Sequence, residues 1–197
     1  PGAFALTLAD PDYPRGLLEL PDPPFVILGL GRREILARRF VLISGTRRPS
    51  AEGASIAREF GAGLGQARLG LASGMMEGVD SESLQGALSG GGGACVIAAT
   101  PLDRVYPPSC RSLMRKVVEK GVILSFLMKG TPFSKENLMR RAQLLAAFAD
   151  ATIVMEADAA SKALFMARLA AELGRDVFAV PGDIFLKSLK GGNELIK

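Results

Sequence analysis

The chain has 197 residues, of which 48% are hydrophobic and 22% are charged. This composition is typical of a chain that folds around a buried core and not of a disordered chain. No apolar run approaches the roughly 20 residues that span a bilayer, and the sequence begins with no signal peptide, so we expect a cytoplasmic protein with no membrane partner. The absence of histidine removes the commonest general base and metal ligand, and the formal net charge of +4 favours a polyanionic partner only weakly.

The first part of the chain is rich in proline, with five prolines from Pro11 to Pro24. Each proline disfavours a helix at its own position and at the residue before it. We therefore expect little regular structure over residues 1–24. Residues 1–38 are predicted to form a lead-in that packs on the core, and residues 39–197 are predicted to form the core domain.

From Phe25 onward, apolar runs of strand length alternate with segments of helical length. The predicted strands are 25–28, 40–44, 69–72, 94–99, 122–126, 151–156 and 177–181. The predicted helices are 51–66, 79–88, 110–120, 135–148 and 161–173, with a short helix or turn at 33–40. In the first long helix, one face can be shared by Ala54, Ala57, Phe60 and Leu64.

Strands that are apolar throughout and separated by helices indicate a mainly parallel sheet with helices on both faces. The fold class is therefore α/β, doubly wound and Rossmann-like. In such folds ligands bind beyond the carboxyl ends of the strands, so the turns that follow the strands are the candidate site.

The turn after the strand at 40–44 has the chemistry of a phosphate site. Gly45 permits a sharp turn, Arg47 and Arg48 follow it, and Ser50 can cap the helix that begins near Ala51. The free N–H groups and the positive dipole end of that helix favour an anion. The turn matches neither a P-loop nor GxGxxG, so no ATP or NAD cofactor is expected.

Two further turns have similar chemistry. Ser73 and Gly74 form a tight turn ahead of Asp80, which is as well explained by helix capping as by ligand binding. In the third turn Ser161 is a candidate cap, with Lys162 beside it. The three turns are predicted to converge on one crevice.

A basic band adds to this pattern. Lys129, Lys135, Arg140 and Arg141 belong to it, preceded by Arg111, Arg115 and Lys116, and it is either a solvated surface or a track for a nucleic-acid backbone. Phe133 can stack on bases, whereas Phe126 and Phe148 are better explained by core packing. No catalytic residue or metal ligand is predicted, and the predicted nucleic-acid-binding residues are Gly45, Arg47, Arg48, Ser50, Ser73, Gly74, Lys135, Arg140, Arg141, Ser161 and Lys162.

Over almost its whole length the chain resembles the DNA-processing protein A (DprA/Smf) family. The resemblance is carried, in the family's order and spacing, by YPRGLLELPDPPFVILGLG, SGTRRPS, SGMMEGVDSESLQGAL, TPLDRVYP, GTP, VMEADAASKAL, ELGRDVFAVPGD and GGNELI. It implies a homodimer without enzymatic activity. It further implies binding to single-stranded DNA and delivery of the RecA recombinase during the uptake of transforming DNA.

The chain departs from the family pattern at five places. Three are single residues: Glu77 stands where the family has an arginine, Leu84 where it has a histidine, and Phe126 where it has a glutamate. The other two are short segments: Arg141-Ala142-Gln143 replaces Arg-Asn-Arg, and Ser161-Lys162-Ala163 replaces Ser-Gly-Ser. Our hypothesis is that Lys162 supplies the positive charge that is missing at Glu77 and Gln143.

Two alternatives to DNA binding stay open. One is an enzyme similar to the phosphoribohydrolases that cleave nucleoside monophosphates, although their PGGxGTxxE signature is absent and Glu156 is the one pocket carboxylate expected. The other is a divergent family member that has kept the fold and lost DNA binding.

Overall fold

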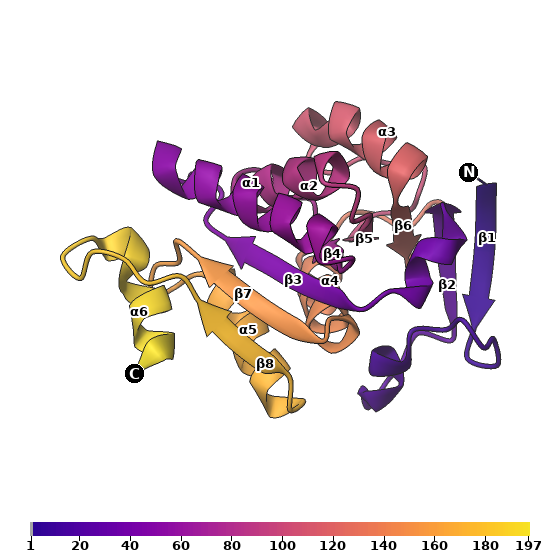
Figure 1. The fold of residues 1–197 in the computed structure, drawn as a ribbon. Coiled ribbons are helices and arrows are strands. Elements are labelled where there is room, and N and C mark those ends of the chain that lie inside the picture. Colours follow the sequence, from indigo (N-terminus) through magenta and orange to yellow (C-terminus); the bar gives the residue numbers. More distant parts are fainter. Residues whose placement is uncertain (1) are drawn as a thin grey trace.

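The computed structural model describes residues 2–197, which form one eight-stranded sheet between two layers of helices (Figure 1). The strands are β1 (Gly2–Thr7), β2 (Val26–Gly31), β3 (Phe40–Gly45), β4 (Gly70–Ser73), β5 (Ala94–Ala98), β6 (Val122–Ser125), β7 (Ala151–Met155) and β8 (Asp176–Ala179). Their order in the sheet is β1-β2-β6-β5-β4-β3-β7-β8.

The sheet is mainly parallel, as predicted. Strands β3 to β8 pair in parallel, whereas β2 is antiparallel to both β1 and β6. The chain runs from β3 outward through β4, β5 and β6, and then returns to the other side of β3 to form β7 and β8. The direction of winding therefore reverses at β3, and the crevice of a doubly wound fold is expected at the carboxyl ends of β3 and its neighbours.

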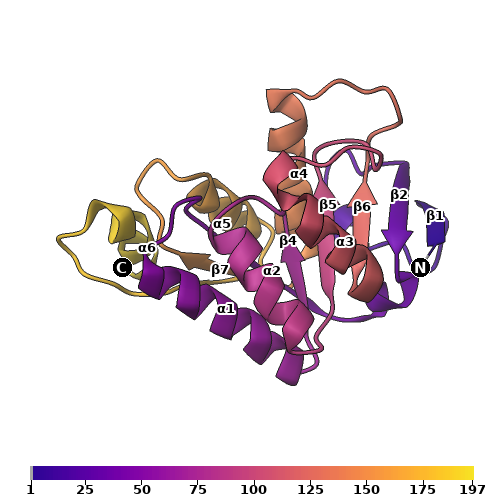
Figure 2. The ribbon, with the colours of Figure 1, turned by 90° about the horizontal axis from the view of Figure 1, so that it is seen from above.

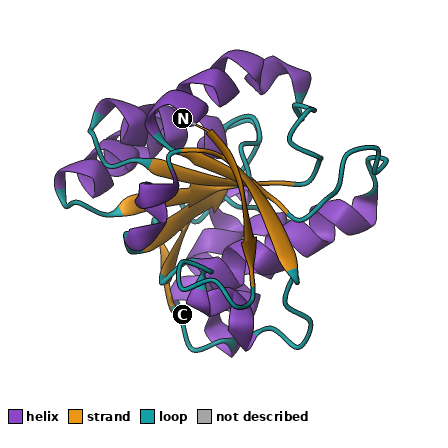
Figure 3. Cartoon of the chain, turned by 90° about the vertical axis from the view of Figure 1, so that its right-hand side faces the viewer, coloured by secondary structure: helices purple, strands orange, loops and turns teal. Residues whose placement is uncertain are grey.

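Helices cover both faces of the sheet, as Figures 2 and 3 show from two directions. They are α1 (Ala51–Gln66), α2 (Val79–Ser89), α3 (Arg111–Lys120), α4 (Lys135–Phe148), α5 (Lys162–Glu172) and α6 (Lys190–Ile196). Ile43 of β3 packs toward α1, α2 and α3, and the adjacent Leu42 packs toward α4. Both are buried, which explains why the strands read as continuous apolar runs.

Helix α1 has the predicted bounds but a different buried face. Its buried residues are Gly53, Ala57, Gly61 and Gly65, whereas Phe60 is 42% exposed. A Cβ on Gly61 would collide with the carbonyl oxygen of Ser83 in α2, so the two helix backbones are in direct contact. Ala57 is buried and Leu64 packs against the core, as predicted, but Phe60 does not belong to the buried face, and apolar periodicity did not reveal its three glycines.

The prediction of little regular structure over residues 1–24 was also wrong. Residues 2–7 form β1, which pairs with β2 along its whole length and buries Leu6, and a 3-10 helix spans Arg15–Glu19. The prolines all lie outside β1, so they do not interrupt its hydrogen bonds. The division of the chain near residue 38 stays a prediction.

Helix α6 was not predicted either, and its glycine pair, Gly191 and Gly192, is buried. None of the helices formed by residues 2–197 has both the length and the apolar character needed to cross a membrane.

Candidate functional site

The three predicted turns meet at a pocket of about 340 Å³ beyond the carboxyl ends of β3, β4 and β7. Its walls come from the turns themselves and from helices α2, α4 and α5. The structure brings together at this pocket six of the predicted site residues, which are Gly45, Arg47, Gly74, Arg141, Ser161 and Lys162. The expected convergence on one crevice is thus present.

Arg141 forms the floor of the pocket from helix α4. Its side chain is buried, and its Nη1 donates hydrogen bonds to the carbonyl oxygen of Gly74 at 2.9 Å and to Sδ of Met76 at 3.4 Å. A Cβ on Gly74 would lie 2.9 Å from the guanidinium carbon, so the absent side chain lets the arginine lie against the turn. The Nε atom of Arg141 is buried and has no hydrogen-bond partner. Burial lowers the pKa of Arg141, and the nearby Asp80 opposes this shift.

Asp80 is the second buried charge of the pocket. Its carboxylate accepts long hydrogen bonds from the Met76 N–H, at 3.3 Å, and from Ser44 Oγ, at 3.5 Å. Burial raises the pKa of Asp80 to about 6, and Arg141 and Arg47 only partly oppose the shift. Asp80 does not cap α2, because Gly78, with a φ of 78°, is the residue at the N-cap position.

Exposed charges form the rim. Arg47, in the turn after β3, and Lys162, the first residue of α5, both line the pocket and are exposed. Ser161 caps α5 by accepting a hydrogen bond from the Ala163 N–H at 3.2 Å, as predicted. Asp158 contributes a carboxylate to the same wall, and its Oδ1 accepts a hydrogen bond from the Ala160 N–H.

The N-terminus of α1 holds an anion, but that anion is the chain's own Glu156. Ser50 caps the helix through the Gly53 N–H, as predicted, and the Ser50 N–H donates to Oε2 of Glu156 at 2.8 Å. The Ser50 hydroxyl also bonds to this carboxylate. The predicted phosphate contact at this helix end stays a prediction, and a phosphate there would have to compete with Glu156. The expectation of Glu156 as the one carboxylate in the pocket was wrong. The carboxylates that line the pocket are Asp80 and Asp158.

The other predicted site residues lie outside the pocket, each for a visible reason. Ser73 is fully buried, and its Oγ accepts a hydrogen bond from the Met75 N–H. Arg140 forms an ion pair with Asp22 at 3.4 Å. Arg48 and Lys135 are exposed and do not line the pocket. The structure thus separates each adjacent arginine pair, with Arg47 and Arg141 at the pocket and Arg48 and Arg140 away from it.

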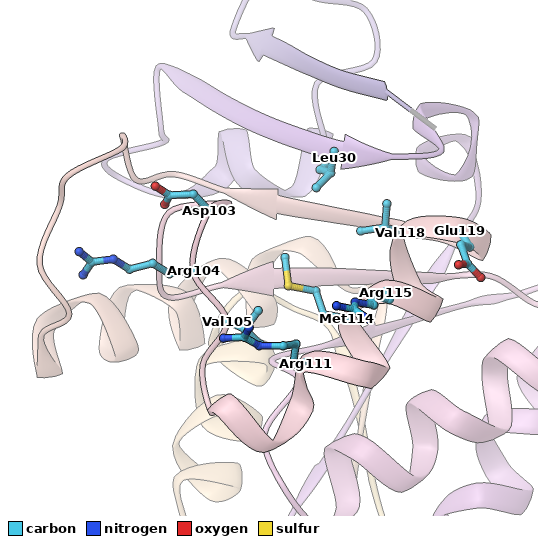
Figure 4. A pocket seen from close by; sticks show the side chains of 9 residues that line it. All are labelled: Leu30, Asp103, Arg104, Val105, Arg111, Met114, Arg115, Val118 and Glu119. Atoms are coloured by element: carbon cyan, nitrogen blue, oxygen red, sulfur yellow. The ribbon is translucent and has the colours of Figure 1, made fainter.

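The basic band is divided in the same way. Arg111 and Arg115 of α3 line a different hollow of about 660 Å³, together with Arg104 (Figure 4). This hollow lies between α3 and β2, and besides its charged side chains it is lined by Met114 and Val118 of α3 and by Leu30 of β2. No predicted site residue lies there, so the two halves of the band do not form one surface around the pocket.

An aromatic pair stands close to the pocket. The rings of Tyr106 and Phe133 lie 4.3 Å apart between centroids and are tilted by 34°, and Phe133 is 42% exposed. Tyr106 is near enough to Arg141 to influence the pKa of that arginine. Phe126 and Phe148 instead pack against the core, as expected.

Sequence reasoning missed Ser44, Thr46 and Asp158 as pocket residues, and it left the role of Asp80 open. The signal that was available is their position at the carboxyl ends of two strands: Ser44 and Thr46 at the end of β3, and Asp158 in the turn after β7. Within residues 2–197, no cluster of three or more histidine, cysteine, aspartate or glutamate side chains has an arrangement suited to a metal ion.

Comparison with known proteins gives a consistent result. The family model of DNA recombination-mediator protein A matches residues 4–197. Protein Smf of Synechocystis is 34% identical over 195 residues. The X-ray structure of DNA processing protein A (DprA) from Streptococcus pneumoniae superimposes with a TM-score of 0.91, at 30% identity over 98% of this chain and 68% of that chain.

A structure of DNA processing protein A from Helicobacter pylori, described for its unique single-stranded DNA binding mode, gives a TM-score of 0.88. It is 27% identical, and the match covers 98% of this chain and 86% of that chain. Both solved structures are named as DNA processing protein A. This chain spans about half of the Synechocystis protein, since the match covers 97% of this chain and 49% of that protein.

Proposed function

Since this chain belongs to the DprA/Smf family of DNA recombination-mediator proteins, we propose that it binds single-stranded DNA in the pocket formed by Arg47, Arg141 and Lys162. The observation that carries the proposal is that the guanidinium of Arg141 is buried and only partly hydrogen-bonded. A buried guanidinium with an unpartnered Nε is costly unless a partner completes its hydrogen bonds. Arg141 lines the pocket, so an anion bound there would compensate the positive charge of this buried guanidinium.

A phosphodiester is an anion that suits this arrangement. Arg141 offers a fixed, water-poor donor at the bottom of the pocket, and Arg47 and Lys162 offer mobile positive charges at its rim. Arginine donors match the geometry of phosphate oxygens, whereas a lysine acts as a point charge. Contacts of this kind position the backbone without reading the base sequence, so we expect little sequence preference.

Two observations favour a single strand over a duplex. The pocket, at about 340 Å³, has room for a nucleotide and not for a double helix. The Tyr106–Phe133 pair presents an exposed aromatic surface on which an unpaired base can stack. The single-stranded DNA binding ascribed to the Helicobacter pylori protein supports the same choice.

The departures from the family pattern lie mostly outside the pocket. Glu77 is exposed and accepts a hydrogen bond from Ser109, and Gln143 accepts one from Arg140. Lys162 and Ala163 are the departures that line the pocket, and Lys162 adds a positive charge there. This distribution favours retained DNA binding over a divergent member without it, and it supports our hypothesis that Lys162 compensates for charge missing elsewhere.

Partners of the whole protein are proposed from the family alone. We propose a homodimer and delivery of the RecA recombinase to the bound strand. Strand β8 is an edge of the sheet, and exposed apolar side chains gather on and after it, at Phe178, Ile184, Phe185 and Leu186. An exposed apolar edge of this kind supports pairing with a second copy of the chain.

The proposal is tested by comparing two adjacent arginines. Arg47→Ala removes a pocket charge, so we expect binding to oligo(dT) to weaken roughly fivefold near 100 mM salt, and the salt slope to fall by about 0.7. Arg48→Ala removes the same charge one residue away, outside the pocket, and is expected to bind like the parent. Filter binding at several salt concentrations measures both quantities.

Equal losses in the two variants would contradict the assignment of the pocket, because they would show that general positive charge attracts the DNA. Unchanged binding by Arg47→Ala, with an intact circular dichroism spectrum, would remove Arg47 from the site.

A further inference from the structure

Asp80 is an unusual neighbour for a site that binds anions. It is 7% exposed, and its two hydrogen bonds, at 3.3 and 3.5 Å, are long. Arg141 lies in the same pocket, but the two side chains form no ion pair in the described part of the chain. The Asp80 carboxylate is therefore poorly compensated, and an anion entering the pocket meets a buried negative charge.

We propose that binding of a phosphate group in this pocket is coupled to the uptake of one proton by Asp80. The inference rests on the proposed function, and it concerns how the same site is regulated by pH. The proton comes from the solvent and resides on the carboxylate, which then no longer repels the bound phosphate.

The physical basis is the repulsion between like charges in a site with little water. Burial already brings the pKa of Asp80 to about 6, within reach of neutral pH. A phosphate bound beside Arg141 offsets the positive charge that stabilises the ionised Asp80 carboxylate. The phosphate also brings a negative charge of its own close to that carboxylate. Both effects raise the pKa of Asp80 further in the complex, so the complex binds more protons than the free protein.

We assign the proton to Asp80 by considering the charged and titratable groups that surround it. Arg141 faces it from α4, Arg47 from the turn after β3, and Cys110 from the start of α3, while Asp158 and Lys162 form the opposite wall. The arginines keep their charge throughout the relevant range. Burial raises the pKa of the Cys110 thiol, which therefore stays protonated. The sequence has no histidine, the usual source of pH dependence near neutrality.

The test measures binding of oligo(dT) by filter binding between about pH 8 and about pH 5.5 at constant ionic strength, because thymine does not titrate there. We expect the affinity of the parent to rise as the pH falls, by up to about tenfold for each unit by which the phosphate raises the pKa of Asp80. Asp80→Asn, which is isosteric and neutral, is expected to bind tightly at every pH. Asp176→Asn, which removes an exposed carboxylate at the start of β8 outside the pocket, is a matched control that is expected to keep the pH slope of the parent.

A second measurement needs no variant. Calorimetric titration of the parent in two buffers of different ionisation enthalpy gives the number of protons taken up. We expect this number to lie clearly above zero near pH 6.5, with an upper limit of about 0.8 because Asp80 is already partly protonated there, and to vanish in Asp80→Asn. Binding that is independent of pH, or a slope that persists in Asp80→Asn, would overturn the inference and leave the proposed function standing. Absence of binding at every pH would overturn both.

Discussion

We expect Arg141→Met to weaken the binding of single-stranded DNA about a hundredfold, an effect much larger than that of any exposed charge. The guanidinium of Arg141 is buried, fixed by Gly74 and Met76, and left with an unpartnered Nε. A charged contact made in such a place is worth about 3 kcal/mol, because little water competes for it. Methionine keeps the length and apolar stem of the side chain and removes only its charge and donors.

The matched control is Arg140→Met, in the adjacent residue. Arg140 pairs with Asp22 outside the pocket, so its loss is expected to change affinity by less than about threefold. Because Arg141→Met removes the larger of the two positive charges that act on Asp80, Arg47 being the other, the double variant with Asp80→Asn should be measured beside it. Binding like the parent by a folded Arg141→Met, or binding like Asp80→Asn by the double variant, would show that Arg141 only supports the turn.

The second large effect concerns stability. We expect Gly61→Ala to lower the free energy of unfolding by about 2 kcal/mol, although alanine normally favours a helix. The new Cβ would collide with the carbonyl oxygen of Ser83, so α1 and α2 must move apart. A loss of this size lowers the Tm of a chain of this length by roughly 6 °C.

Gly63→Ala provides the control in the same helix. No atom lies within 4 Å of a Cβ placed on Gly63, and the residue is exposed. The substitution is therefore expected to raise the free energy of unfolding by about 0.5–1 kcal/mol. Thermal and urea unfolding measure both variants. Two stabilised variants would contradict the direct contact between the helix backbones.

Apolar periodicity and turn chemistry predicted most of the fold. The bounds of α1 and α4 agree with the prediction, and the caps Ser50 and Ser161 lie where the sequence places them. Predictions from apolar periodicity failed where the packing of an element does not depend on large apolar residues. The glycine face of α1 is one case, and β1, whose pairing depends on a distant part of the chain, is another.

The site was predicted in part, because three turns after parallel strands must converge. Its chemistry depends on burial, which a single sequence does not reveal. Arg141 and Arg140 are equivalent in the sequence, yet the rotation of α4 turns one inward and the other toward Asp22. Glu156, which was expected in the pocket, instead closes the end of α1, and Asp80, whose role the sequence left open, lies in the pocket.

The central claim is that this chain binds single-stranded DNA through a phosphate pocket. The most direct test is a filter-binding titration of the parent with oligo(dT) and with a duplex of equal length, at about 50 mM and about 200 mM salt. We predict tighter binding of the single strand at both salt concentrations, with affinity falling as salt rises. Absence of single-strand binding at the lower salt concentration, or equal affinity for the duplex, would contradict the account.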